Sequence, residues 1–155
     1  MKHLTRDAFN RARDFIKTQA RPLDRALFEH RFEDAPVARV AAALSRYQNA
    51  DGGFGHALEP DVRTPHSSAL ATGHGLTMLK ELGFSPAHPM AAQAVVYLHD
   101  TFDEENQVWR VIPPEANEAP HAPWWHDEDG SLAQTFDDFL VVPRAQIVGR
   151  SEERR

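Results

Sequence analysis

Apolar residues recur at intervals of three or four positions through most of this chain, and this spacing constrains the fold more than any other feature. With the flanking start and stop residues, it predicts helices over about 5–19, from Pro22, from Val37 to a turn at 51–53, from Ser67 or Ser68 to Gly83, and from Pro89 through Phe102. Ser131 and Gln134 form a capping box that predicts a further short helix. Strand-like residues are confined to Val108–Ile112. We therefore expect an all-α fold.

Two glycines, Gly73 and Gly75, lie inside the helix predicted to end at Gly83. Each glycine costs up to about 1 kcal/mol relative to alanine in a helix interior. That cost is easier to explain if a second helix packs closely at this point. We therefore expect a close helix–helix contact there.

Length and composition fit one hydrophobic core, since 41% of the 155 residues are hydrophobic. We expect a single helical domain over residues 1–149 and a charged tail over residues 150–155. No stretch has the length of a membrane span, and the first residues lack the continuous apolar core of a signal peptide. A cytoplasmic location without a membrane span is the resulting expectation.

Charge and cysteine content exclude several classes of function. The chain has 17 Lys and Arg against 23 Asp and Glu, a formal net charge of −6, with basic residues scattered among acidic ones. We therefore expect neither nucleic acid nor an anionic membrane as a partner. No cysteine is present, which excludes disulfides, thiolate nucleophiles and cysteine-ligated zinc.

The segment Tyr47–Gly55, YQNADGGFG, resembles the QxxDGGW/F repeat motif of squalene cyclases, terpene cyclases and protein prenyltransferase β subunits. The following SSALATGHGLTMLKELG is similar to the inner helix that comes next in those repeats. A longer run from Arg21 through HAPWW to VPRAQIVG resembles uncharacterised bacterial members of the same superfamily. The resemblance implies antiparallel helical hairpins that form the N-terminal part of an α/α toroid.

Physical roles for the motif residues follow from their types. Gln48 can bond free backbone groups of the next helix, Gly52 and Gly53 can reverse the chain, and Phe54 can pack the turn. About six hairpins close such a toroid and this chain supplies roughly three. The resemblance therefore implies either a homodimer or a longer protein whose C-terminal half is missing here.

The family's known reactions leave no complete signature in this chain. The DxDD segment of proton-initiated cyclases is absent, with partial echoes at Glu59-Pro60-Asp61 and Asp137-Asp138, and the prenyltransferase zinc site requires a cysteine. Asp103-Glu104-Glu105 could hold magnesium, but a solvated charge run is the simpler explanation. We predict no cofactor, and whether the chain is an enzyme stays open.

A first loop, residues 55–66, concentrates polar candidates. His56, Glu59, Asp61 and His66 offer nitrogen and oxygen ligands, but their spacing matches no metal signature, so no metal site is predicted. Asp61 is a candidate catalytic residue, and His56 and Glu59 are candidate ligand-binding residues. His74, on the helix that follows, faces either a cavity or the core.

A second loop, residues 113–130, is rich in prolines, tryptophans, histidines and carboxylates. Trp124 and Trp125 could form an aromatic wall, and Glu115 with His121 or His126 could supply acid, base or hydrogen-bonding groups. Glu115 and His121 are candidate catalytic residues, and Trp124, Trp125 and His126 are candidate ligand-binding residues. Such a site would suit a sugar ring or an isoprenoid. Alternatively, the tryptophans plug the end of the toroid and His121 bonds a backbone carbonyl.

Two functional hypotheses follow. The first is a toroid that binds or acts on a small ligand in a central cavity, at a concave site formed by Trp124, His121, Glu115, Asp61 and His56. The second is a non-catalytic structural or interaction module. It would dock through an exposed inner face made of Leu70, His74, Met78, Ala94 and Leu98.

Overall fold

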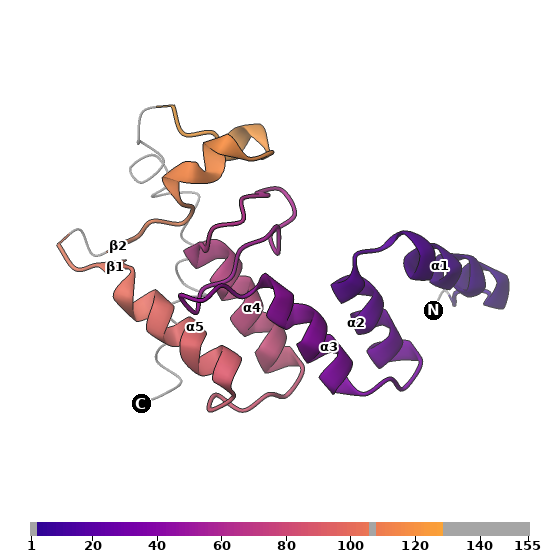
Figure 1. Cartoon of the computed structure of the whole chain (residues 1–155). Helices are drawn as coiled ribbons and strands as arrows, with labels where there is room; N and C mark the ends of the chain where they lie inside the picture. Colours follow the sequence, from indigo (N-terminus) through magenta and orange to yellow (C-terminus); the bar gives the residue numbers. More distant parts are fainter. Residues whose placement is uncertain (1–2, 106–107, 129–155) are drawn as a thin grey trace. The chain divides into compact units, whose positions relative to one another are not determined.

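Helices dominate the computed structural model, which describes residues 3–105 and 108–128 (Figure 1). Its elements are α1 (Arg6–Gln19), α2 (Pro22–Phe32), α3 (Val37–Leu44), η1 (Ser45–Tyr47), α4 (Ala69–Glu81), α5 (Pro89–Asp100), β1 (Phe102–Asp103), β2 (Val108–Trp109), η2 (Pro114–Glu118) and η3 (Pro123–Trp125). Within these ranges the only sheet is the antiparallel β1–β2 pair. The described part is therefore mostly helical, as predicted. The helix predicted at Ser131, and Asp137 and Asp138, lie outside it.

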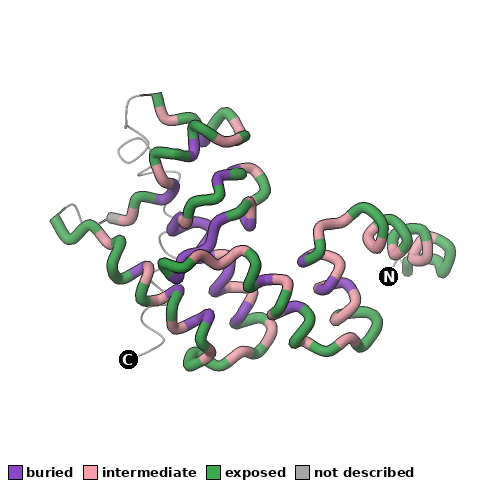
Figure 2. The backbone as a smooth tube through the Cα atoms, viewed as in Figure 1, coloured by how far each residue is buried: buried purple, intermediate pink, exposed green. Residues whose placement is uncertain are grey.

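The chain divides into two compact units, and residues 1–45 form the first. Helix α1 begins where the Thr5 hydroxyl accepts a hydrogen bond from Ala8 N at 3.2 Å. The rings of Phe9, Phe28 and Phe32 cluster with centroids 5.0 to 6.0 Å apart. No residue of α1 is buried, although its apolar residues follow helical spacing (Figure 2).

The second unit begins at Arg46 and contains α4 and α5, which pack against each other. The hydroxyl of Ser68 caps α4 by accepting a hydrogen bond from Ala71 N at 3.0 Å, which decides between the two predicted caps. Most of α4 is buried (Figure 2). Among the described residues, no helix is both long and apolar enough to cross a membrane.

The prediction that the fifth helix continues through Phe102 is wrong. Helix α5 ends at Asp100, and Phe102 pairs with Trp109 in the β1–β2 hairpin. Their rings lie 4.5 Å apart, and the Trp109 indole donates to the carbonyl of Leu98 at 2.6 Å. Phe102 therefore lies outside the helix, because it packs against Trp109 across the hairpin.

The DGGFG segment forms a tight turn held by side chains. Gly52 has a φ of +88°, and the Asp51 carboxylate accepts from Gly53 N at 2.9 Å and from the Ser67 hydroxyl at 2.8 Å. The Gln48 amide donates to the carbonyls of Gly52 (2.9 Å) and Met90 (3.0 Å). The motif had suggested a contact between Gln48 and the next helix, α4. In the structure, Gln48 instead bonds the backbone of α5.

Phe54 anchors this turn against α4. Its side chain is completely buried, and its backbone N–H donates to the buried Thr72 hydroxyl at 2.9 Å. A Cβ added at Gly75 would approach the Phe54 ring to 2.8 Å. The expected helix–helix contact at Gly75 is therefore wrong, because the turn residue Phe54 takes that space.

The inner face proposed for docking is largely covered. Leu70, Ala94 and Leu98 are buried, while His74 and Met78 are partly exposed. The predicted exposed apolar patch on this face is therefore wrong. Helices α4 and α5 cover much of it by packing together.

Candidate functional site

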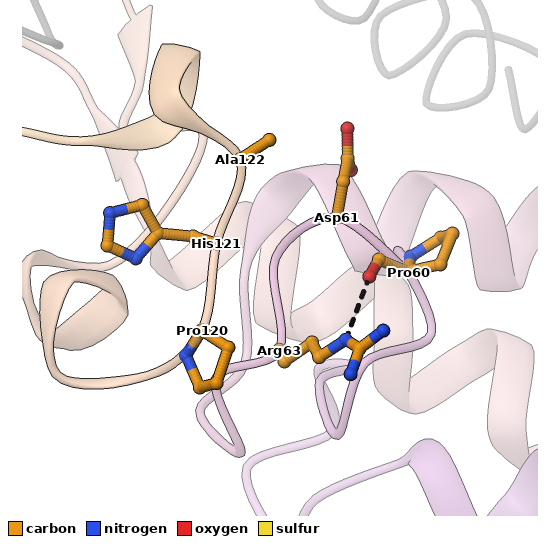
Figure 3. A pocket seen from close by; sticks show the side chains of 6 residues that line it. All are labelled: Pro60, Asp61, Arg63, Pro120, His121 and Ala122. Atoms are coloured by element: carbon orange, nitrogen blue, oxygen red, sulfur yellow. Dashed lines mark hydrogen bonds between the residues drawn. The ribbon is translucent and has the colours of Figure 1, made fainter.

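The two polar loops singled out in the sequence pair with each other (Figure 3). Val62 and His121 form an antiparallel bridge. Ala122 N donates to the carbonyl of Asp61 at 2.8 Å, and Arg63 N donates to the carbonyl of Pro120 at 3.0 Å. Two segments about 60 residues apart thus form one short two-stranded patch, because their backbone groups satisfy each other.

An apolar cluster connects this patch to the rest of the second unit. It consists of buried Val62, Leu70, Val111, Ile112, Ala116 and Trp125, with Ala122 packed against it. Leu70 N at the start of α4 also donates to the carbonyl of Val111 at 3.1 Å. The two loops therefore rest on a core, and their backbone is held in place.

A surface pocket of about 310 Å³ lies at the paired loops, lined by Pro60, Asp61, Arg63, Pro120, His121 and Ala122 (Figure 3). The Asp61 carboxyl group points away from the Arg63 guanidinium, whose Nε donates to the carbonyl of Pro60 at 3.3 Å. The pocket thus has an acid, a guanidinium and an imidazole on different walls.

The side chain of Glu59, two positions before Asp61, contacts that of His74. The Glu59 Oε2 atom lies 2.8 Å from His74 Nδ1, and the Glu59 side chain is mostly buried. Glu59 belongs to the loop, whereas His74 belongs to α4, so the contact ties the loop to the helix. His74 is half-exposed and paired with this carboxyl group, so the alternative that it is a core residue is wrong.

The two carboxyl groups of Glu59 and Asp61 have opposite pKa shifts. The hydrogen bond to His74 is the main reason that the pKa of Glu59 is lowered, and burial opposes it. The pKa of Asp61 is raised, first by its hydrogen bond to Glu59 and then by burial, while the Trp125 indole lowers it to a smaller extent. The surroundings therefore favour the ionised form of Glu59 and the protonated form of Asp61.

His121 and His126 hydrogen-bond to each other. His121 Nε2 lies 3.1 Å from His126 Nδ1, and the two rings are nearly parallel, at 8°, with centroids 5.3 Å apart. His121 Nδ1 lies 2.6 Å from the carbonyl of Ala119, which requires a hydrogen on that nitrogen. The backbone contact expected in the structural alternative for His121 is therefore present.

The remaining candidate residues do not line the pocket. Trp125 is buried in the apolar cluster whereas Trp124 is 56% exposed, so the two rings form no common wall. His56 Nε2 lies 2.8 Å from Asn49 Oδ1, and exposed Glu115 lies in η2. Of the five residues predicted to form one concave site, only Asp61 and His121 line this pocket.

Sequence reasoning missed Arg63, Pro60 and Pro120 as pocket residues. Pro60 and Arg63 lie next to the candidate Asp61 in the sequence, but the loop has no regular pattern that would mark either of them as a pocket residue. In the described ranges, no three or more His, Asp or Glu side chains are grouped to hold a metal ion.

No family model, curated protein or solved structure matches this chain.

Proposed function

We propose that this chain is part of an α/α toroid of the terpene cyclase and prenyltransferase kind that binds a small, hydroxyl-rich ligand, such as a sugar, at the paired loops. The observation that carries the proposal is the pairing of residues 61–63 with 120–122, which gathers Asp61, Arg63 and His121 around one pocket. The mostly helical fold and the DGGFG turn support the toroid part of the proposal.

The chemistry of the pocket favours a polar ligand over an isoprenoid. Three of its six lining residues are Asp, Arg and His, and the others are two prolines and an alanine. Ligand sites for apolar molecules are lined mainly by aromatic and aliphatic side chains, and here the nearby Trp125 is buried in the core. Hydroxyl groups pair well with carboxyl, guanidinium and imidazole groups.

Amide-detected NMR titration of the whole chain with D-glucose, N-acetylglucosamine and farnesol tests the proposal. We expect the two sugars to shift the amide signals of residues 61–63 and 121–122. Arg63→Ala should weaken this response, while Arg46→Ala, which removes another exposed arginine of the same unit, should leave it unchanged. A response to farnesol alone, or shifts confined to other residues, would contradict the proposal.

A second candidate function is self-association, and exposed apolar side chains of the first unit favour it. Leu4, Phe15 and Phe32 are 68%, 67% and 62% exposed, and α1 buries none of its residues. Large exposed apolar groups on neighbouring helices are typical of interaction surfaces. Light scattering over a range of concentrations should show a dimer that Phe15→Ser with Phe32→Ser disrupts. A monomer at every concentration would exclude it.

A further inference from the structure

We infer that the exposed side of helix α1 in one copy of this chain docks onto an acidic surface around η2 and η3 in a second copy. The exposed side chains of this acidic surface are those of Glu115, Glu118, Trp124 and Glu128. The contact rests on self-association, the second candidate function above, and gives it two defined surfaces. It does not depend on the sugar site at the paired loops.

The two compact units of the chain carry opposite net charges. Residues 1–45 contain nine Lys and Arg against six Asp and Glu, a formal net charge of +3. Residues 46–155 contain eight Lys and Arg against 17 Asp and Glu, a formal net charge of −9, so that the two units together give the −6 of the whole chain. This asymmetry favours contacts in which the basic unit of one copy meets the acidic unit of another.

One side of α1 is exposed and combines apolar side chains with a basic one. Ala8, Arg11 and Phe15 are three and four positions apart, so they lie along the same side of the helix. Phe9 lies on a different side, where its ring packs against that of Phe28. Helix α1 buries none of its residues, and Phe15 is 67% exposed. The side that carries Phe15 is therefore an apolar surface with a guanidinium beside it.

The positive charge at Arg11 is not neutralised within the first unit. Four of the six acidic residues of this unit form ion pairs with its basic residues: Asp14 with Arg13, Asp24 with Arg21, Glu29 with Arg39 and Glu33 with Lys17. Arg11 is exposed and forms no ion pair within the part of the chain that the structure describes. Its guanidinium is therefore available to the carboxylates of a partner.

The surface around η2 and η3 has the complementary composition. Residues 111–128 contain four acidic residues and no Lys or Arg. The Asn117 side chain of η2 holds the two elements together, because its Oδ1 accepts from Asp127 N at 3.0 Å and its Nδ2 donates to the Asp127 carbonyl. Trp124 of η3 is 56% exposed. Carboxylates and a large aromatic ring thus lie on one small, internally bonded part of the second unit.

These two surfaces match in chemistry as well as in charge. An arginine binds both to carboxylates and to the face of a tryptophan ring, so Arg11 suits Trp124 and the glutamates of η2. Contact between Phe15 and Trp124 would remove two exposed aromatic rings from water. Arginine and tryptophan are also the residues that most often dominate the binding energy of interfaces.

A contact between unlike surfaces is favoured over one between like surfaces. Two α1 sides that faced each other would bring two Arg11 guanidinium groups together, and two η2–η3 surfaces would bring carboxylates together. A contact between unlike surfaces lets two copies form two reciprocal contacts, or lets more copies add head to tail. Either arrangement uses both surfaces of every copy that is inside the assembly.

Light scattering of the whole chain over a range of concentrations and salt gives the first test. We expect an average mass above that of one chain, which falls between about 50 and about 500 mM NaCl because salt screens the charges. An association that does not weaken with salt would overturn the inference. A monomer at every concentration in low salt would exclude both the inference and the self-association on which it rests.

Two sets of substitutions test the two surfaces separately. Arg11→Gln with Phe15→Ser changes only the α1 side, and Glu115→Lys with Glu118→Lys changes only the acidic surface. Each pair should raise the dissociation constant about tenfold or more. If the acidic-surface variant associates as the wild type does, the α1 sides meet each other, and the inference is wrong although self-association stands.

Matched controls make equivalent changes at other exposed positions. Arg46→Gln with Val96→Ser is the control for the α1 variant, since Arg46 is exposed and Val96 is 56% exposed. Asp100→Lys with Glu105→Lys is the control for the acidic-surface variant, because both residues are exposed. Neither control should change the dissociation constant by more than about twofold. Losses as large as those of the test variants would count against the assigned surfaces.

Mixing the two test variants is the decisive measurement. The α1 variant keeps a native acidic surface, and the acidic-surface variant keeps a native α1 side. An equimolar mixture should therefore form a mixed dimer through one native contact, under conditions in which each variant alone is a monomer. This recovery also shows that both variants are folded. A mixture that stays monomeric while the wild type associates would overturn the inference and leave self-association intact.

Discussion

The ring of Phe54 lies directly over Gly75, so that a Cβ at position 75 would come within 2.8 to 2.9 Å of three ring carbons. Phe54 is fully buried, and it belongs to the turn rather than to a helix. Glycine is a poor helix former, so Gly75 weakens α4. Its lack of a side chain nevertheless leaves the space in which the turn residue Phe54 packs.

Replacing Gly75 with alanine should destabilise the chain. The helix gains up to about 1 kcal/mol in propensity, but overpacking against a rigid ring costs typically about 1 to 3 kcal/mol. Urea denaturation measures the balance. In the background of Phe54→Leu, the same alanine should cost less, because a smaller side chain leaves room. Equal effects in both backgrounds would show that the contact with Phe54 is not the cause.

Gly52 and Gly83 form a matched pair of positive-φ glycines. Both have φ values in the left-handed region, +88° and +75°, but a Cβ at Gly52 would lie 2.6 Å from the Gln93 carbonyl oxygen, whereas one at Gly83 meets nothing within 4 Å. Gly83→Ala should cost roughly 1 kcal/mol from backbone strain alone. Gly52→Ala should cost clearly more by the same urea measurement. Similar losses of stability in the two variants would mean that the contact between position 52 and Gln93 relaxes without further cost.

Two threonines of α4 test the hydrogen bond that holds the turn. Thr72→Val removes the acceptor for Phe54 N, leaves a buried N–H without a partner, and should cost about 1 to 3 kcal/mol. Thr77→Val removes only a bond to the Gly73 carbonyl on a half-exposed part of the helix and should stay within about 0.5 kcal/mol. Thermal unfolding of both variants provides the comparison, and Thr72→Ser should restore most of the loss.

Asp61 should make stability depend on pH with a defined sign. Its folded pKa is raised above 3.8, so its contribution to stability is fully present below pH 3.8 and is lost as the pH rises through the folded pKa. Asp61→Asn cannot ionise. The free energy of unfolding of the wild type relative to this variant should therefore decrease over that pH interval. A difference that stays constant with pH would mean that Asp61 titrates alike in both states.

Several elements could be predicted from local sequence because local forces decide them. The helix starts at Pro22 and Pro89, a serine cap at position 67 or 68 and the reversal at Gly52 follow from backbone geometry and from hydrogen bonds within a few residues. The end of α5 could not be predicted in this way. Phe102 continues the apolar spacing, but its aromatic contact with Trp109 depends on the return of the chain through the hairpin.

In the candidate site, too, some features could be predicted from the sequence and others could not. Sequence alone identified the residue types and the two loops that carry them, because unusual concentrations of His, Trp, Asp, Glu and Pro are visible without coordinates. Only the tertiary structure decided which residues meet: Glu59 against His74, and the two loops side by side. The physical reason is that hydrogen bonds and packing between segments far apart in the chain set these distances, and no local spacing encodes them.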